Sequence, residues 1–333
     1  MTQGFFPAAR GLAGAALSAF SLALLLPGAA QAQGDAWPSR SIKIVVGYAP
    51  GGPSDITARL LAPKLTAALG QPVIVENKAG AGSNLAFEYV AAAAPDGYTL
   101  LLAAAPIVMN NKLYKNLKYD PVKSFEPVIN VMTSPSVLAV APNLPVQNLQ
   151  QFIALAKKEP GRLTYSSSGN GGTQHLAGEL LEQRAGLDMI HVPYRGAAPA
   201  LNDLVAGQVS AGFQTAMGAL VHLKNNAPRP IAVASTKRLP QLPNVPTFAE
   251  SGLPDVVVES WNGMFAPAGT PQAIVNRLNA EVNKALASPD IRDNFENSGA
   301  YGVGGTPAEF KRYVAEEVDR WGKLMKSTNI SLD

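Results

Sequence analysis

The chain has 333 residues, of which 27 are basic and 24 acidic, with three histidines and no cysteine. This near balance excludes the strong positive field that nucleic acid or an anionic membrane would require, and the missing cysteine excludes disulfides and a lipid-anchored cysteine. His175, His191 and His222 form no close pair of metal-ligand spacing, so we expect neither a metal site nor another cofactor.

Residues 1–32 have the pattern of a secretory signal peptide. Arg10 precedes the apolar run 11–26, and small residues follow up to Ala30-Gln31-Ala32, which is typical of a cleavage site. Because the run is shorter than the roughly 20 residues that span a bilayer, we expect cleavage near Ala32. An uncleaved N-terminal anchor is the alternative. Cleavage predicts a periplasmic protein, long enough for two domains of ordinary size.

The first part of the remaining chain alternates strands and helices. We predict strands over 41–48, 73–75, 99–103 and 125–132. The helix after the first strand has apolar residues at helical spacing, with Ser54 or Asp55 as its cap and a kink or a broken first turn at Pro63. Short loops between strands and helices predict an α/β fold with a mostly parallel sheet, covered by helices on both faces.

The same alternation starts again after Pro135. The predicted strands are 137–140, 163–166, 189–192, 209–213 and 230–234, and the predicted helices are 149–158, 173–183, 198–205 and 217–224. A strand over 256–265 and three helices follow, the last opened by a capping box of Thr306 and Glu309 and running to about Lys326.

Two α/β units in this order predict two lobes joined by two crossover strands. The chain crosses near residue 135 and returns near residue 258. We therefore expect lobe 1 to comprise residues 33–135 and 259–333, and lobe 2 to comprise residues 136–258. A ligand cleft is expected between the lobes.

Three strand-to-helix turns combine glycine with small polar side chains. They are Pro50 to Asp55, Gly80 to Asn84 and Ser166 to Thr173. Each turn puts unpaired amides and the positive end of a helix dipole at one place, which suits a carboxylate or a phosphate. In open parallel sheets such turns lie at the carboxyl edge, where ligands bind. At any single turn, glycine that serves only the turn geometry is the alternative.

Nucleotide-binding motifs do not fit this chain. The run Gly169-x-Gly171-Gly172 lacks the third glycine of a dinucleotide fingerprint at the required spacing, and no phosphate-binding P-loop occurs.

Three further residues allow two interpretations each. His175 can be a base beside Ser168, or a hydrogen-bonding group near the ligand. We favour the second, because no Gly-x-Ser-x-Gly elbow occurs and no acid is evident behind the imidazole. Arg195 can bind an anion or pair with an acid, and Trp261 can line the cleft or pack in the core.

Ordered motifs run through nearly the whole chain after residue 32. They are Tyr48–Asp55, Glu76–Gly82, Ala94–Tyr98, Tyr119–Val122, Gly169–Gly171 with His175–Glu179, Pro193–Gly196, Leu242–Thr247 and Ala266–Pro271. In these motifs the chain resembles the solute receptors of the tripartite tricarboxylate transporter, also called Bug-type receptors. The resemblance implies a type II periplasmic binding fold, whose two lobes close around a small carboxylate and deliver it to a membrane permease without catalysis.

The resemblance also implies where the ligand is bound. The contacts that we expect are Tyr48, Gly51, Gly52, Ser54 and Asp55 on the first turn, Ser168, Asn170, Gly172, Thr173 and His175 on the second-lobe turn, and Tyr194 and Gln214 beyond it. Many relatives have an acidic residue at the position of Gln214. Glutamine there implies a mono- or dicarboxylate with a neutral body, aliphatic or aromatic, rather than an amino acid.

Two alternatives to a transport receptor remain. A receptor of this fold can feed a sensor protein instead of a permease. An exported hydrolase would use Ser168 and His175, but it would also need an orienting group and an oxyanion site that the sequence does not place. We expect a monomeric solute-binding receptor that is not an enzyme.

Overall fold

A computed structural model describes Met1 and residues 37–328 of the chain. Apart from Met1, the predicted signal peptide and its cleavage site lie outside the described residues. The strands are β1 (Ile42–Val46), β2 (Val73–Asn77), β3 (Thr99–Ala103), β4 (Phe125–Val140), β5 (Thr164–Ser167), β6 (Ile190–Pro193), β7 (Ala211–Thr215), β8 (Arg229–Ala234), β9 (Glu259–Pro267) and β10 (Tyr301–Gly304).

The helices alternate with these strands along most of the chain. They are α1 (Pro53–Leu69), α2 (Asn84–Ala91), α3 (Pro106–Leu113), α4 (Leu149–Lys158), α5 (Thr173–Ala185), α6 (Ala197–Val205), α7 (Ala216–Lys224), α8 (Gln272–Ala287), α9 (Pro289–Asn297) and α10 (Pro307–Thr328), with a short 3-10 helix η1 (Ala81–Ser83) before α2. None of the helices in the described part of the chain has the length and apolarity needed to cross a membrane.

The strands form two sheets that share β4. In the first sheet the order is β2-β1-β3-β9-β4, and β10 also pairs with β4. In the second sheet β4 lies beside β7 and β8, and β7 is followed by β5 and β6. The partner of β4 changes within the strand, because residues up to Pro135 pair with β9 whereas residues from Ser136 pair with β7 and β8.

The prediction of a mostly parallel sheet is correct only for the strands that do not connect the two sheets. The groups β1, β2, β3 and β5, β6, β7 are each parallel, but β4 and β9 are antiparallel to all their neighbours. The reason is that the chain crosses to the second sheet along β4 and returns along β9. The strands predicted over 125–132 and 137–140 are one strand, since Pro135 lies where β4 changes partners and does not end it.

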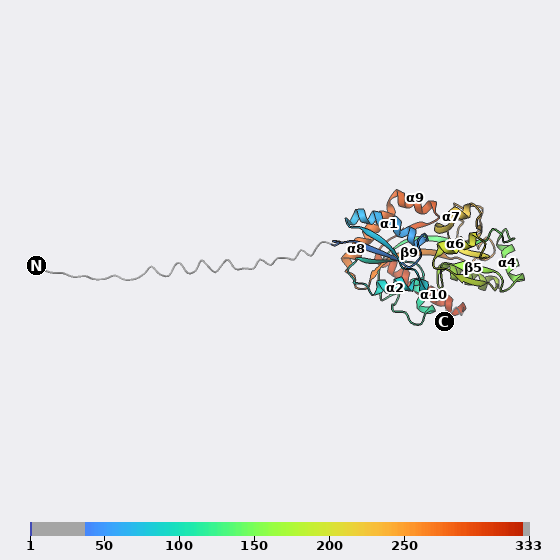
Figure 1. The fold of residues 1–333 in the computed structure, drawn as a ribbon, viewed down its shortest axis with the longest axis horizontal. Coiled ribbons are helices and arrows are strands. Elements are labelled where there is room, and N and C mark those ends of the chain that lie inside the picture. Colours follow the sequence, from blue (N-terminus) through green and yellow to red (C-terminus); the bar gives the residue numbers. More distant parts are fainter. Residues whose placement is uncertain (2–36, 329–333) are drawn as a thin grey trace. The chain divides into compact units, whose positions relative to one another are not determined.

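Helices cover both faces of each sheet. In the first sheet α1, α8 and α9 pack on one face and α2, α3 and α10 on the other, while α4 and α5 oppose α6 and α7 across the second sheet. Figure 1 shows α1, α9 and α7 toward the top of the view and α2 and α10 toward the bottom. This arrangement makes two α/β lobes, one around each sheet.

The ends of two helices test the sequence predictions. The capping box of α10 is confirmed, because Glu309 N donates to Thr306 Oγ1 at 3.2 Å and Thr306 N donates to Glu309 Oε2 at 2.7 Å. The predicted side-chain cap of α1 is wrong. Gly52 is the N-cap residue of α1, so Ser54 and Asp55 lie inside its first turn, and α1 continues through Pro63 without a break.

Two elements were not predicted. Helix α3 is buried on nearly all sides, so its sequence lacks the polar face that marks an amphipathic helix. Strand β10 has four residues, of which Gly302 and Gly304 are poor strand formers.

Gly263 of β9 provides a test of the packing between the first sheet and α10. A Cβ atom at Gly263 would overlap the ring of Phe310. We expect Gly263→Ala to lower the free energy of unfolding by about 1–3 kcal/mol in denaturant titrations, because overpacking forces shifts. In the control Gly322→Ala, the new Cβ meets only Lys112 Cε at 3.8 Å, and stability should stay equal or rise. A Gly263→Ala protein as stable as its parent would contradict this packing.

Candidate functional site

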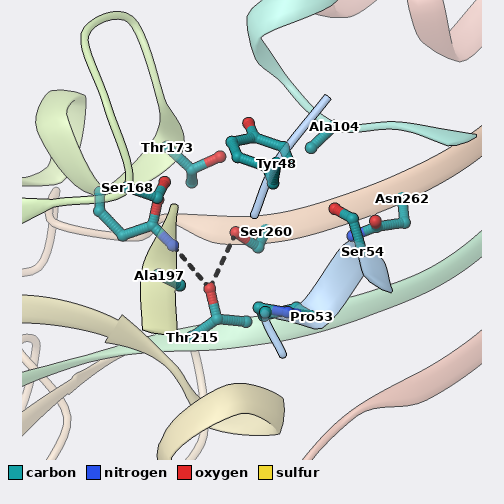
Figure 2. A pocket seen from close by; sticks show the side chains of 12 residues that line it. Tyr48, Pro53, Ser54, Ala104, Ser168, Thr173, Ala197, Thr215, Ser260 and Asn262 are labelled. Atoms are coloured by element: carbon teal, nitrogen blue, oxygen red, sulfur yellow. Dashed lines mark hydrogen bonds between the residues drawn. The ribbon is translucent and has the colours of Figure 1, made fainter. Parts of the chain in front are cut away.

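A cavity lies between the two lobes and the crossover strand β9. Its lining residues, drawn in Figure 2, are Tyr48, Gly52, Pro53, Ser54, Ala104, Ser168, Thr173, Gln174, Ala197, Thr215, Ser260 and Asn262. None of these side chains is acidic, basic or a histidine.

Four helices begin at the wall of this cavity. Pro53, Thr173 and Ala197 are the first residues of α1, α5 and α6, and Thr215 is the N-cap residue of α7. In none of the four does the side chain of the N-cap residue cap the helix, although Ser134 Oγ accepts from Met217 N in the first turn of α7. The remaining first-turn amides and the positive dipole ends together attract an anion without a charged side chain.

Asp55 holds the first turn rather than lining the cavity. Its carboxylate is buried and accepts hydrogen bonds from Gly51 N at 2.9 Å, from Asn77 Nδ2 at 2.9 Å and from Arg59 Nε at 3.0 Å. Burial raises the pKa of Asp55, but the hydrogen bonds from Arg59, Gly51 and Asn77 outweigh burial and hold the pKa below its usual value. Asp55 thus stays ionised and fixes the loop before α1.

A chain of hydrogen bonds links the second-lobe turn to the crossover strand. Ser168 Oγ donates to Gln174 Oε1 at 2.7 Å, and Gln174 Nε2 donates to Thr215 Oγ1 at 2.7 Å. Thr215 Oγ1 in turn donates to Ser260 Oγ at 3.3 Å, as the dashed lines of Figure 2 show for the bonds of Thr215. Polar groups from the turn after β5 and from α5, β7 and β9 are therefore held in one arrangement around one side of the cavity.

His175 lies behind the second-lobe turn and does not line the cavity. Its Nδ1 accepts from Gly171 N at 3.1 Å, and its Nε2 lies 3.4 Å from Glu179 Oε1. Glu179 is thus an acid behind the imidazole, which the sequence analysis did not find. Ser168 bonds to Gln174 instead of to the imidazole, so the serine–histidine pair of a hydrolase is not formed.

Burial and the neighbouring His175 keep a second histidine neutral behind the same turn. The ring of His191 stacks on His175 with centroids 3.9 Å apart, and its Nε2 lies 2.7 Å from Ser167 Oγ. Burial, together with the neighbouring His175, lowers the pKa of His191 to about 3. The hydrogen bond of His175 with Glu179 lowers the pKa of that carboxyl despite its burial.

A second, outer cavity shares Tyr48 and Ser168 with the first. It is lined by Gly47, Tyr48, Gly80, Ala81, Gly82, Ser83, Tyr114, Ser168, Gly169, Asn170, Pro193, Tyr194 and Arg195. The predicted contacts Asn170 and Tyr194 lie here, as does the glycine-rich turn before α2. Tyr194 donates its hydroxyl to Asp203 at 2.6 Å, and Arg195 is exposed.

The remaining predicted contacts lie close to the cavity without lining it. Gly51 and Gly172 flank lining residues in their turns, whereas Gln214 is buried in β7 next to Thr215. The side-chain amide nitrogen of Gln214 has no hydrogen-bond partner in the described residues. The structure thus brings five of the predicted contacts together at the cavity, namely Tyr48, Gly52, Ser54, Ser168 and Thr173.

The sequence analysis missed the polar residues that β9 contributes. Ser260 and Asn262 line the cavity, and the residue between them, Trp261, points to the opposite face of the strand. Trp261 packs against Phe310 and donates Nε1 to Glu317 at 3.0 Å, so the core interpretation of this tryptophan is correct. The sequence could have indicated them, because they are two polar residues at alternate positions of an otherwise apolar strand.

The sequence is similar to that of proteins already described. Residues 57–330 match the model of a family described as tripartite tricarboxylate transporter family receptor. The chain is 40% identical over 292 residues to the UPF0065 protein in the tcbD-tcbE intergenic region of Pseudomonas sp. strain P51. The aligned residues make up 87% of each of the two chains. The chain is 36% identical over 306 residues to Protein BugT of Bordetella pertussis strain Tohama I, covering 91% of this chain and 94% of that one.

The structure is also similar to solved structures. Rpa4515 of R. palustris with adipate has a TM-score of 0.85 at 37% identity, covering 88% of this chain and 99% of that one. The periplasmic binding protein BugD has a TM-score of 0.85 at 34% identity with the same coverage. MatC (Rpa3494) of Rhodopseudomonas palustris with bound malate has a TM-score of 0.81 at 35% identity, covering 85% of this chain and 98% of that one.

The lowered pKa of Asp55 predicts a pH-dependent contribution to stability. Because the pKa of the folded state lies below that of the unfolded state, the contribution is complete above about pH 4 and disappears as the pH falls through the folded-state value. We expect Asp55→Asn to lower the free energy of unfolding by about 1–3 kcal/mol at pH 7, and by less as the pH falls below about 4.

A surface carboxylate serves as the control for this measurement. Asp290 pairs with Lys64 at the surface, so Asp290→Asn should leave the free energy of unfolding nearly unchanged. Denaturant titrations between pH 3 and pH 7 would measure both variants. An Asp55→Asn effect of equal size at all of these pH values would contradict the assigned role.

Proposed function

The chain belongs to the tripartite tricarboxylate transporter receptor family, and we propose that it holds a small carboxylate between its lobes and delivers it to a membrane permease of that transporter type. Relatives of known structure have adipate or malate bound, and both are carboxylates. The two-lobed α/β periplasmic binding fold expected from the sequence is confirmed by the similarity to BugD.

The observation that carries this proposal is a cavity without charged side chains at which four helices begin. A buried carboxylate needs hydrogen-bond donors and a positive potential, and the helix starts supply both. A ligand ammonium group would find no carboxylate among the lining side chains. The cavity therefore favours a carboxylate with a neutral body over an amino acid.

We assign direct ligand contacts to the predicted residues that line the cavity. These are Tyr48, Gly52, Ser54, Ser168 and Thr173. Of the other predicted residues, Gly51, Asp55, Gly172 and His175 would hold the two turns in shape, Gln214 would support Thr215 from within β7, and Asn170 and Tyr194 would meet the ligand on its way through the outer cavity.

The predicted lobe boundaries are part of the proposal. The change of partners along β4 falls between Pro135 and Ser136, and Ser136 N donates to Val258 O at 3.2 Å where the chain returns. Across the cleft Ala49 N donates to Arg195 O at 3.2 Å. These contacts support lobes of residues 33–135 with 259–333 and of residues 136–258, which close by hinge motion around the ligand.

Binding without catalysis agrees with the relatives, which are solute-binding proteins. The hydrogen bond of Ser168 with Gln174 further supports a receptor over a hydrolase. The predicted cleavage near Ala32 supports a periplasmic location, in which a monomeric receptor would diffuse to its permease.

A thermal-shift screen of residues 33–333 tests the ligand class. We expect adipate, malate or another mono-, di- or tricarboxylate to raise the melting temperature, because a ligand that binds only the folded state stabilises it. Amino acids and sugars should produce no shift, and the carboxylate should be recovered unchanged. A shift with amino acids or sugars alone would overturn the proposal, and a consumed carboxylate would indicate an enzyme.

A variant of Ser168 tests the site. We expect Ser168→Ala to weaken binding of the best carboxylate of the screen about tenfold, because one hydrogen bond and the fixed position of Gln174 are lost. Titration calorimetry would measure the dissociation constants. The control is Ser298→Ala at the end of α9, where the hydroxyl bonds only to Phe295 O. Equal affinities in both variants would exclude Ser168 as a contact.

A further inference from the structure

Asn262 is a buried amide whose hydrogen-bonding capacity is largely unused. Its residue exposure is 1%, and it lines the cavity from β9. Its Nδ2 reaches only Met132 Sδ, at 3.9 Å, and its Oδ1 has no partner in the described residues. Leaving a buried polar atom unpaired destabilises the folded protein, so an amide in this position indicates a partner that arrives with the ligand.

Ser54 provides a second polar group on the same side of the cavity. It is 4% exposed, lies in the first turn of α1 and lines the cavity with its hydroxyl-bearing side chain. Figure 2 shows Ser54 and Asn262 at one side of the cavity and Ser168 and Thr173 at the other. Ser260, two residues before Asn262 on the same face of β9, differs because Thr215 already bonds to it.

The contact with Met132 determines which atom of the amide is available. A thioether sulfur is a weak acceptor and donates nothing, so it suits the amide nitrogen and leaves the buried Oδ1 without a partner. An amide oxygen only accepts hydrogen bonds. A ligand carboxylate has no hydrogen to donate to Oδ1, whereas a ligand hydroxyl can donate to Asn262 and accept from Ser54.

We propose that Ser54 and Asn262 form a subsite for a ligand hydroxyl group, and that Asn262 selects a hydroxycarboxylate over the carboxylate that lacks the hydroxyl. This inference rests on the proposed function, because it assumes that the carboxylate itself is held by the helix starts. It adds a specificity residue on β9 and narrows the ligand class.

Matched pairs of carboxylates with and without a hydroxyl test the subsite. The probes are lactate and propionate, malate and succinate, 4-hydroxybutyrate and butyrate, and 6-hydroxyhexanoate and hexanoate, each titrated calorimetrically into residues 33–333. We expect the hydroxylated member to bind about tenfold more tightly in at least one pair. Asn262→Leu should reduce that ratio to about one.

Asn130 offers a matched control. It lies on β4 beside β9, is 8% exposed and also has an unpaired Oδ1, but it does not line the cavity. Asn130→Leu should therefore retain the hydroxyl preference of the parent. Asn262→Asp keeps an acceptor and adds a negative charge, so it should retain the preference while binding every carboxylate more weakly; this variant carries the test if Asn262→Leu does not fold.

The outcomes separate this inference from the proposed function. Carboxylate binding without a hydroxyl preference, or a preference that Asn262→Leu leaves intact, would overturn the subsite and keep the receptor. A preference lost equally in Asn130→Leu would also overturn it. Absence of binding by every carboxylate would overturn both.

Discussion

The antiparallel pairing of β4 with β9 is the constraint on which the cavity depends. These strands carry the chain between the two sheets, so they fix how closely the lobes approach and supply the shared wall that holds Ser260 and Asn262. The pairing also ties a helix start to this wall. Ser134 of β4 accepts from Met217 N in the first turn of α7 and donates to Gly299 O. The turns on either side can move with their lobes while this wall stays in place.

Anion binding at such a site relies on groups that are neutral and already oriented. Amides at helix starts need no counter-charge, whereas a lysine or arginine inside the cavity would lose its hydration and have to be paired when the ligand is absent. Tyr48, which lines the cavity, also stays neutral. Burial raises the pKa of Tyr48 to about 12, against a weaker effect of its hydrogen bond with Ser83, so its hydroxyl remains a hydrogen-bond donor at physiological pH.

Local sequence patterns predicted most helices, strands and turns. Which residues line the cavity depends on tertiary contacts, which these patterns do not show. Helix α4 lies over the predicted residues 149–158, and glycine with small polar residues after β1 and β5 marked the turns that reach the cavity. The contributions of Ser260 and Asn262 were missed, because strand periodicity alone does not tell a cavity from solvent or core. Glu179 was overlooked although it lies four residues after His175, on the same helical face.

At the cavity, backbone amides attract the anion and side chains form its surroundings, and this separation has an evolutionary consequence. The groups that attract the anion belong to the backbone, so a mutation of a lining side chain changes the surroundings of the carboxylate without removing the amides that hold it. A substitution at a lining position such as Asn262 can therefore change which acid fits while the helix-start amides are kept. The capacity to bind an acid at all is inherited with the fold.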